Sequence, residues 1–241
     1  MKCSADYSVK RFFREHFSFN KTDMTRTAKS LIIIFLILIA DQALKIWVKT
    51  TMSLGDEYVI FKDWFILHFV ENNGMAFGFE FAGEYGKMFL SIFRILAVIA
   101  IGWYLFKLAK QKEIPFGFVV SISLIFAGAI GNIIDSLFYG LIFEQSYGQV
   151  SAIFPEGGGY ASFLHGKVVD MFYFPLINGR YPNWIPYFGG NEFIFFRPVF
   201  NIADSAITTG IFSILIFYRK YFNKVEEKQT EEISDQNPET A

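Results

Sequence analysis

The sequence predicts a mainly α-helical membrane protein that crosses the bilayer four times and keeps both termini in the cytoplasm. Hydrophobic residues make up 53% of its 241 positions and only 19% are charged, whereas soluble domains carry about 25% charged residues. The mean hydropathy is +0.33. Four apolar segments reach the roughly 20 residues that a helix needs to cross a hydrocarbon core. The positions of the basic residues then set the orientation of these segments.

The four predicted spans differ in the signals that mark them. The first begins with the apolar run 31–40. A basic stretch before a short apolar run is also typical of a cleavable signal peptide, but no small-residue cleavage site follows and the helical periodicity continues through Trp47. Gly128 and Gly131 in the third span are small enough to allow close contact with another helix. The predicted spans are residues 31–50, 87–106, 116–139 and 198–218.

Lys and Arg are distributed unevenly between the connections. Seven lie in residues 1–30, three in the short connection 107–114 and four in residues 219–228. The two long connections, 51–86 and 140–196, together hold only three. Because cytoplasmic segments of membrane proteins carry an excess of Lys and Arg, we expect both long connections to lie outside the cytoplasm.

The predicted organisation has three parts. Residues 1–29 form a basic cytoplasmic extension, residues 30–222 the membrane domain, and residues 223–241 a disordered polar cytoplasmic tail. In the first outer connection, Glu57–Val70 is rich in β-branched and aromatic residues and predicts strands. The second outer connection, 140–196, is a long loop whose many aromatic rings suit the membrane interface.

Several acidic and amide side chains lie inside or beside the apolar spans, and the predicted orientation places all of them on the outer side of the membrane, with Asp41 and Lys45 in the middle to outer half of their span. A charge at membrane depth is costly, so it usually faces the bundle interior and marks a functional site. Asp41 and Lys45 are four residues apart, so they share a helix face and can pair. The polar residues predicted at this depth are Asp41, Lys45, Asn132, Asp135, Asp170, Asn201 and Asp204.

These acids do not point to catalysis equally. Asp41, with a lysine one turn later, favours a buried structural ion pair. Asp135 favours a role in orienting a neighbouring amide. Asp170 on its own fits an interfacial loop acid as well as a catalytic group. Asp204 is the hardest to explain structurally, because it lies inside an apolar span one turn after an asparagine.

Two carboxylates held close together suit the hydrolysis of a peptide bond. They cannot both ionise comfortably, so they share one proton and titrate as a unit. The ionised member can take a proton from water while the neutral member hydrogen-bonds to a substrate carbonyl. We therefore interpret Asp170 and Asp204 as the dyad of an intramembrane aspartic peptidase, which requires no cofactor.

Other function classes fit the sequence less well. The three histidines lack the spacing of metal ligands, there is no Gly-x-Ser-x-Gly motif, and the single cysteine, Cys3, cannot form an internal disulfide. The net charge of −1 shows no bias towards nucleic acid. A small ion-coupled transporter subunit is the main alternative, since buried acids can relay protons, although the inner halves of the third and fourth spans carry no charged residue. A membrane scaffold is a further alternative.

Five short motifs follow one another along the chain. They are Asp41-Gln42-Ala43-Leu44-Lys45, Asn72-Asn73-Gly74-Met75-Ala76-Phe77-Gly78, Gly131-Asn132-Ile133-Ile134-Asp135, Val168-Val169-Asp170-Met171-Phe172 and Phe200-Asn201-Ile202-Ala203-Asp204. Each motif is weak alone, but their order and predicted membrane depth are specific. Together they resemble one family, the lipoprotein signal peptidases or bacterial signal peptidases II, from about residue 30 to residue 220.

The resemblance implies an aspartic endopeptidase that removes signal peptides from prolipoproteins by cutting just before a diacylglyceryl-modified cysteine. It implies that Asp170 and Asp204 form the catalytic dyad near the outer face of the bacterial cytoplasmic (inner) membrane. It also implies a β-rich cradle built from residues 51–86 and inhibition by globomycin-type compounds. We expect prolipoproteins and membrane lipid as partners, no cofactor, metal or nucleic acid, and a monomer. The residues implied to support the site or position substrate are Asp41, Lys45, Asn72, Gly74, Asn132, Asp135, Asn201 and Ala203.

The chain departs from the usual family pattern at three places. Ser136 stands where the family usually has Arg after the aspartate of the third span, and Arg197 is a candidate to replace that arginine. Met75 stands where Ala is common. The segment between Asp135 and Asp170 is long for the family, which predicts an elaborated outer loop that could act as a lid.

Overall fold

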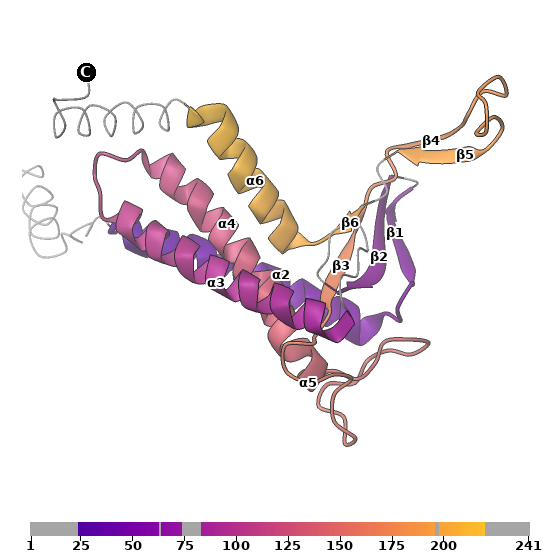
Figure 1. Cartoon of the computed structure of the whole chain (residues 1–241), viewed down its shortest axis with the longest axis horizontal. Coiled ribbons are helices and arrows are strands. Elements are labelled where there is room, and N and C mark those ends of the chain that lie inside the picture. Colours follow the sequence, from indigo (N-terminus) through magenta and orange to yellow (C-terminus); the bar gives the residue numbers. More distant parts are fainter. Residues whose placement is uncertain (1–23, 63, 74–82, 196–197, 220–241) are drawn as a thin grey trace, which may run out of the picture.

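The computed structural model describes residues 24–62, 64–73, 83–195 and 198–219. Figure 1 shows a bundle of helices, with a small sheet and a projecting hairpin at one end. The helices are α2 (Arg26–Thr51), α3 (Gly83–Ala109), α4 (Phe116–Ile134), α5 (Gly140–Ile142) and α6 (Ile202–Phe217), and a π-helical turn, η2 (Asp135–Tyr139), joins α4 to α5.

Three of the described helices are long and apolar enough to cross a membrane. They are Arg26–Thr51, Gly86–Ala109 and the continuous run Phe116–Ile142 formed by α4, η2 and α5. The predicted fourth span, 198–218, agrees less well, because Val199–Phe200 form a strand and the apolar helix α6 has only 16 residues. At 1.5 Å per residue such a helix is about 24 Å long. The fourth crossing therefore stays a prediction.

The first helix begins earlier than the apolar pattern indicated. Thr25 is its N-cap, and the Thr25 hydroxyl accepts a hydrogen bond from the backbone N–H of Ala28 at 3.1 Å. A capping Thr satisfies one of the free N–H groups of the first turn, so the helix starts at Arg26, inside the stretch predicted as a separate extension. The predicted tail, 223–241, lies outside the described residues.

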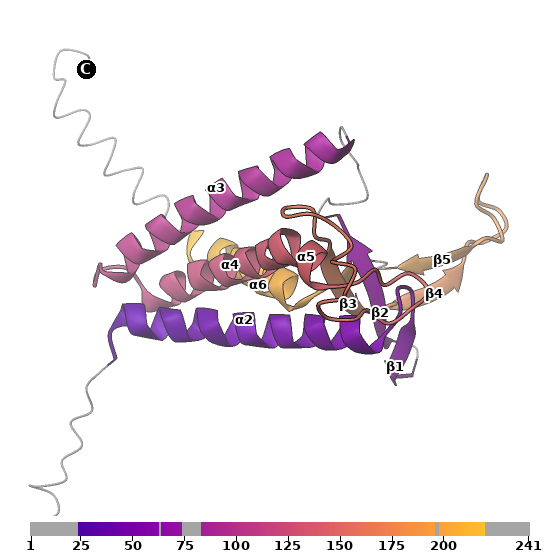
Figure 2. The same ribbon diagram turned by 90° about the horizontal axis from the view of Figure 1, so that it is seen from below.

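Helix α4 is the central helix and packs against α2, α3 and α6 (Figure 2). Two of its glycines make this close packing possible. A Cβ atom on Gly128 would collide with the backbone carbonyl of Ala203 on α6, and one on Gly131 would lie 2.7 Å from the carboxylate of Asp41 on α2. The two glycines singled out in the sequence therefore let α4 approach both neighbouring helices.

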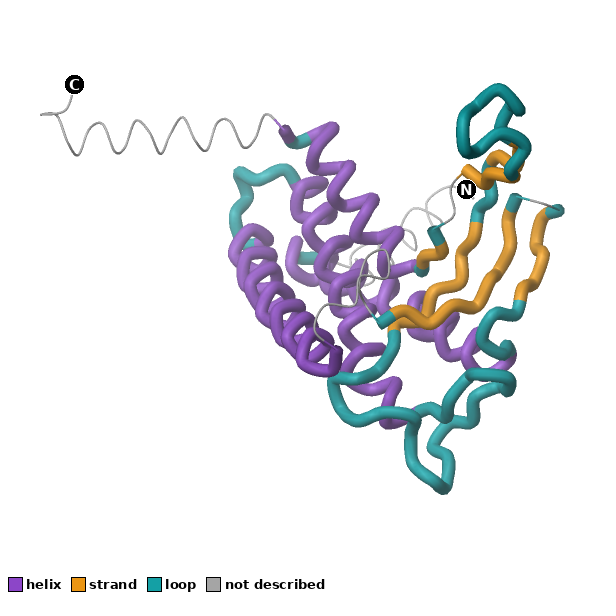
Figure 3. The backbone as a smooth tube through the Cα atoms, turned by 45° about the vertical axis from the view of Figure 1, so that its right-hand side comes forward, coloured by secondary structure: helices purple, strands orange, loops and turns teal. Residues whose placement is uncertain are grey.

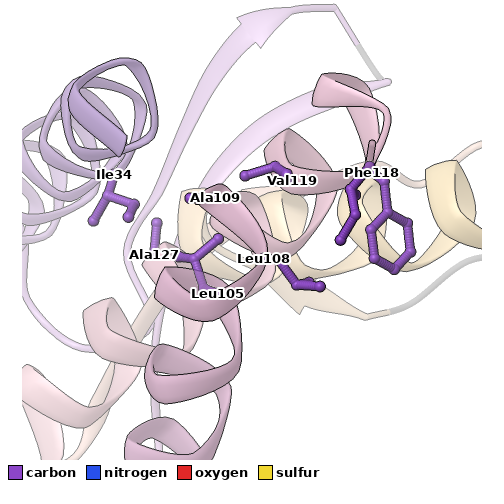
Figure 4. Close-up of a cluster of buried hydrophobic side chains, with 8 residues drawn as sticks. Ile34, Leu105, Leu108, Ala109, Phe118, Val119 and Ala127 are labelled. Atoms are coloured by element: carbon purple, nitrogen blue, oxygen red, sulfur yellow. The ribbon is translucent and has the colours of Figure 1, made fainter. Parts of the chain in front are cut away.

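The bundle has an apolar core at the end remote from the sheet, where α2, α3 and α4 meet (Figure 4). Lipid tails are as apolar as these side chains, so close packing rather than escape from water holds such helices together. The buried members of this core are Ile34, Leu105, Leu108, Ala109, Ile114, Phe118, Val119 and Ala127.

The two outer connections build one antiparallel sheet in the order β1-β2-β3-β6 (Figure 3). The prediction that the β-rich part comes from residues 51–86 alone was incomplete, because β3 comes from the second connection and β6 from the start of the predicted fourth span. A two-stranded hairpin is marginally stable by itself, and β2 gains a second partner in β3. The strands are β1 (Glu57–Phe61), β2 (Phe65–Asn72), β3 (Val168–Tyr173) and β6 (Val199–Phe200).

A second core fastens this sheet to the outer end of the bundle. It combines side chains from the end of α2, from β2 and β3, and from the end of the run α4–η2–α5. Strand β3 contributes two residues with no exposed surface, Val169 and Met171, which pack the strand against the helices. The buried members are Val48, Met52, Leu67, Phe69, Tyr139, Phe143, Val169 and Met171.

Candidate active site

Lys45 lies fully buried in a polar cluster between α2 and the α4–η2 run. Its ammonium nitrogen is 2.9 Å from Asp41 Oδ2 and 2.8 Å from Asp135 Oδ2, and it donates to Asn132 Oδ1 at 2.9 Å. A lysine ammonium has three N–H donors, so each one has an acceptor here. The predicted pair of Asp41 and Lys45 is present, but it is part of a triad with Asp135.

The remaining oxygens of the two acids hold other elements in place. Asp41 Oδ1 accepts a hydrogen bond from the backbone N–H of Ala203, in the first turn of α6, at 2.9 Å. Asp135 Oδ2 accepts one from the backbone N–H of Val169 on β3 at 3.2 Å, and its Oδ1 accepts one from Gln42 Nε2 at 3.0 Å. The buried acids therefore fix the start of α6 and strand β3 against the bundle.

Helix α6 begins with a capping box made by Asn201 and Asp204. Asn201 Oδ1 accepts from the backbone N–H of Asp204 at 2.9 Å, and Asp204 Oδ2 accepts from the backbone N–H of Asn201 at 3.4 Å. The other oxygen of Asp204 accepts from Asn132 Nδ2 at 2.7 Å. The aspartate is thereby held in the first helical turn, where the helix dipole favours a negative charge.

Asp170 reaches the same asparagine from the sheet. Its Oδ1 accepts from Asn201 Nδ2 at 2.7 Å and its Oδ2 from Asn72 Nδ2 on the neighbouring strand at 3.5 Å. Burial and the nearby negative charge of Asp204 raise the pKa of Asp170 to about 7, against the opposing effects of Lys45 and the two amides. Asn201 thus contacts both acids and joins them into one site.

A cavity of about 260 Å³ opens beside Asp204, between α3, α4 and α6. Its polar lining residues are Asp204, Asn132 and Arg94, and the charge of Arg94 interacts with that of Asp204. An arginine within a membrane helix usually marks a functional site, and the sequence offered that signal at position 94. The other lining residues are apolar: Phe93, Ala97, Val98, Ile101, Ala129, Ile133 and Ile207.

The structure brings most of the predicted site residues together, but it differs from the prediction in where it places Asp170. Asp170 lies on a strand inside the sheet rather than in a loop, because β3 pairs with both β2 and β6. Gly74, Met75 and Arg197 lie outside the described residues. One hydrogen-bonded cluster contains Asp41, Lys45, Asn132, Asp135, Asp170, Asn201 and Asp204, with Asn72 and Ala203 at its edge.

Gln42 and Tyr139 also belong to this cluster, although no role was predicted for them. Gln42 donates to both Asp41 and Asp135 and accepts a hydrogen bond from the hydroxyl of Tyr139 at 3.1 Å. The signal for Gln42 was its polarity beside Asp41 in an apolar helix. Ser136, by contrast, donates back to the carbonyl of Asn132 in its own helix at 3.1 Å.

The first part of the long second connection is anchored by another buried ion pair. Lys49 pairs with Glu71 next to Asn72, and Ser146 donates to Glu71 at 2.9 Å. Burial works against ionisation, yet the ammonium groups of Lys49 and Lys167 lower the pKa of Glu71. This contact ties the loop to α2 and β2, and a closing lid motion of the loop stays a prediction.

The chemistry that this cluster supports is that of two acids with different surroundings. Asp170 is buried and its raised pKa favours a neutral carboxyl, whereas Asp204 accepts two N–H donors and lies near a guanidinium. In the ranges that the structure describes, no three His, Cys, Asp or Glu side chains lie close enough to hold a metal ion. A neutral acid beside an ionised one can supply a proton donor and a proton acceptor in the same site.

Comparison with known proteins identifies the family. The chain matches the family model described as Signal peptidase (SPase) II over residues 33–220. It is 54% identical over 186 residues to the lipoprotein signal peptidase of Porphyromonas gingivalis, covering 77% of this chain and 80% of that protein. It is 36% identical over 206 residues to the lipoprotein signal peptidase of Amoebophilus asiaticus, covering 84% and 83%.

Solved structures agree with this assignment. Two structures of a bacterial membrane enzyme match with a TM-score of 0.53 and 28% sequence identity, covering 80% of this chain and 88% and 93% of theirs. The family match over residues 33–220 includes every residue of the polar cluster. The chain therefore belongs to the signal peptidase II family and is a multi-pass membrane protease.

Proposed function

We propose that the protein is an aspartic endopeptidase that removes signal peptides from prolipoproteins by cutting before a diacylglyceryl-modified cysteine, at the outer face of the bacterial cytoplasmic (inner) membrane. One observation carries the proposal. Asp170 on β3 and Asp204 on α6 both hydrogen-bond to Asn201, and Asp204 also lines a largely apolar cavity. In a chain of the signal peptidase II family, this pair of acids is the best candidate for the hydrolytic centre.

The surroundings of the two acids favour different roles. Asp204 accepts hydrogen bonds from the Asn132 amide and from the backbone of Asn201, and Arg94 provides a nearby positive charge. These groups hold the carboxylate of Asp204 beside the cavity, where it can act as the general base. Asp170, with its pKa raised to about 7, is neutral in mildly acidic solution and can donate its proton in a hydrogen bond.

The proposed reaction follows from these roles. Asp204 accepts a proton from a water molecule, and the water oxygen forms a bond to the scissile carbonyl carbon. Asp170 donates its hydrogen bond to the carbonyl oxygen, where negative charge develops. Asp204 then delivers its proton to the amide nitrogen as the C–N bond breaks, and the carbonyl oxygen returns to its neutral, double-bonded form. No cofactor is needed.

The cavity beside Asp204 matches the chemistry of the proposed substrate. A lipidated precursor presents hydrocarbon chains and an apolar signal sequence, and most of the side chains lining the cavity are apolar. Ligand sites of this kind combine an apolar wall with a few polar groups that fix orientation. Arg94 and Asn132 are the groups placed to contact peptide carbonyls next to Asp204.

The rate of cleavage is expected to fall as the pH rises through about 7. The neutral form of Asp170 predominates below its pKa of about 7, and above that pH the proton that should be donated to the substrate is lost. The value of kcat/KM should therefore decline about tenfold per pH unit on the alkaline side. Recovery of full activity after return to a mildly acidic buffer would separate titration from unfolding. A flat profile between about pH 6 and about pH 9 would contradict this role of Asp170.

The proposed function predicts that purified protein cleaves a diacylglyceryl-modified precursor and leaves the same precursor uncut when its cysteine is unmodified. Globomycin should block the reaction. The products are identified by mass spectrometry, which also locates the cut bond. If neither precursor is cut while vesicles containing the protein conduct protons or cations, the peptidase proposal fails and the transporter alternative is favoured.

A further inference from the structure

The hairpin of β4 (Ile177–Arg180) and β5 (Glu192–Phe195) carries exposed aromatic rings that the proposed reaction does not use. The tip of this hairpin, residues 181–191, contains no Asp, Glu, Lys or Arg. Three of its rings are largely exposed: Trp184 at 81%, Tyr187 at 98% and Phe188 at 57%. Apolar side chains gathered in this way on an ordered segment mark an interaction site.

The backbone of the tip is folded in a way that displays these rings. Backbone hydrogen bonds join Gly190 to Tyr181 and Gly189 to Ile185, each at 2.9 Å. Tyr187 has a φ angle of 67°, a left-handed conformation that non-glycine residues adopt only when their surroundings enforce it. The tip is therefore a built structure that holds the side chain of Tyr187 outward, not an unstructured loop with incidental aromatic residues.

The hairpin is tethered to membrane-associated elements at both ends. Strand β4 begins at Ile177, four positions after β3 ends, and β5 ends at Phe195, seven positions before α6 begins. An arm of about nine residues per side reaches at most about 30 Å. Figure 1 shows the hairpin projecting sideways from the sheet, away from the helices. The tip therefore stays within reach of the lipid that surrounds the outer end of the bundle.

The charges of the hairpin lie at its base and not at its tip. Arg180 and Glu192 form an ion pair at 2.9 Å, and both side chains are exposed. Beyond this pair the hairpin offers rings that combine an apolar body with a polar group, as in Trp and Tyr. Such residues prefer the boundary between headgroups and hydrocarbon.

We propose that the tip of the β4–β5 hairpin inserts its aromatic rings into the interfacial region of the outer leaflet. Lipid is the occupant that the structure favours over a protein partner, for two reasons. The tip provides no charges with which a protein partner could be selected, and a bilayer already surrounds a multi-pass membrane protein at the depth from which the arm emerges.

This contact has a consequence for the candidate active site, and that consequence rests on the proposed function. The hairpin is the connection between β3, which carries Asp170, and the β6–α6 segment, which carries Asp204. A membrane contact at its tip would hold both acids at a constant height relative to the bilayer surface. The bond to be cut lies next to a lipid-anchored cysteine, so its height is set by the same surface.

The contact is tested with a fluorescent label attached to the tip of the full-length protein. The single native cysteine is removed by Cys3→Ser, and a nitrobenzoxadiazole label is attached at Asn183→Cys in the tip or at Gln149→Cys, an exposed position in the first part of the same connection. The protein is placed in vesicles of phosphatidylethanolamine and phosphatidylglycerol that carry nitroxide on the lipid headgroups. Quenching at position 183 should exceed that at position 149 by about twofold or more.

Matched variants then ask whether the rings cause the quenching. The double substitution Trp184→Ser with Tyr187→Ser should lower the quenching at position 183 to the level seen at 149. Tyr147→Ser, which removes an exposed ring outside the hairpin, should leave it unchanged. Sodium chloride between about 0.05 M and about 0.5 M should have no effect, because the tip is uncharged.

Three results would overturn the proposal: equal quenching at both labelled positions, quenching that survives removal of the two rings, or quenching that disappears in salt. These measurements do not depend on peptidase activity, so a failure of the proposed function would leave them interpretable. If the protein does cleave precursors, the double variant should be several-fold slower in bilayers and unchanged in detergent, where no surface sets the height of the site.

Discussion

Replacing Asp170 or Asp204 by Asn is expected to lower the turnover number for precursor cleavage by about 10³-fold or more, since each carboxyl group is assigned a proton-transfer or proton-donating role in the same step. Asn keeps the shape of the side chain but cannot take up or release the proton. Cleavage is measured with a purified, diacylglyceryl-modified precursor under single-turnover conditions, so that product release does not mask the chemical step.

These variants should remain folded, which makes the measurement interpretable. Asp170 is buried near the negative charge of Asp204, and two like charges in one site destabilise each other. A neutral amide at either position removes that repulsion, but it also replaces one acceptor oxygen by an N–H donor that faces the amide of Asn201 or Asn132. The two effects oppose each other, so we expect the melting temperature of each variant to stay close to that of the wild type. The control is Asp56→Asn, which changes an exposed acid in a turn before β1 and should retain full activity.

The opposite outcome has a definite meaning. If Asp170→Asn or Asp204→Asn cleaves at a rate near that of the wild type, the substituted aspartate has a structural role. Asp135 or Asp41 then becomes the next catalytic candidate. If the two single variants and the double variant lose the same factor, the two acids act as one unit, because the effects of residues that share one step are not additive.

The meeting of these acids could be predicted from the sequence because membrane depth constrains position strongly. An aspartate at a known distance from the end of an apolar helix can lie at only one level. Asp135 and Asp204 were predicted near the outer ends of their spans, and Asp41 in the middle to outer half of its span. The pairing of Asp41 with Lys45 was predicted from a different signal, their spacing of four residues on one helix. Depth alone does not say which acid contacts which amide, and the role of Asn201 as the residue that joins the two acids emerged only from the structure.

Other features depend on tertiary contacts that no local pattern encodes. The π-helical turn η2 begins at Asp135, and π-helical turns inside α-helices occur often at functional sites, but a stretch such as Asp135–Tyr139 reads as ordinary helix. The sheet required β3 to pair with β2, although α3 and the continuous run α4–η2–α5 lie between these strands in the chain. The buried pair of Lys49 and Glu71 was equally hidden, because its partners lie on different elements and each is unremarkable alone.

A second large effect is expected on stability rather than on turnover. Lys45→Met should lower the free energy of unfolding by about 3–5 kcal/mol, because removing one partner of a buried ion pair leaves an uncompensated charge. Lys45 is 0% exposed, and its ammonium group is the cation between the carboxylates of Asp41 and Asp135. Met has a similar length and apolar stem, so the loss of charge is the main change. Unfolding in a graded mixture of mild and denaturing detergent, followed by circular dichroism, measures the effect.

Two further variants test whether the loss of stability comes from the buried charge at position 45. One breaks an exposed ion pair elsewhere, and the other neutralises an acid beside Lys45. Arg180→Gln breaks an ion pair whose side chains are 73% and 74% exposed, and such pairs contribute little to stability, so its unfolding should match that of the wild type. Adding Asp135→Asn to Lys45→Met should recover part of the loss, because one of the two stranded carboxylates becomes neutral. A Lys45→Met protein as stable as the wild type would show that the acids are already neutral in the folded state. The triad would then be a hydrogen-bonded network without net ion pairing, and its role would be to orient Asn132 rather than to balance charge.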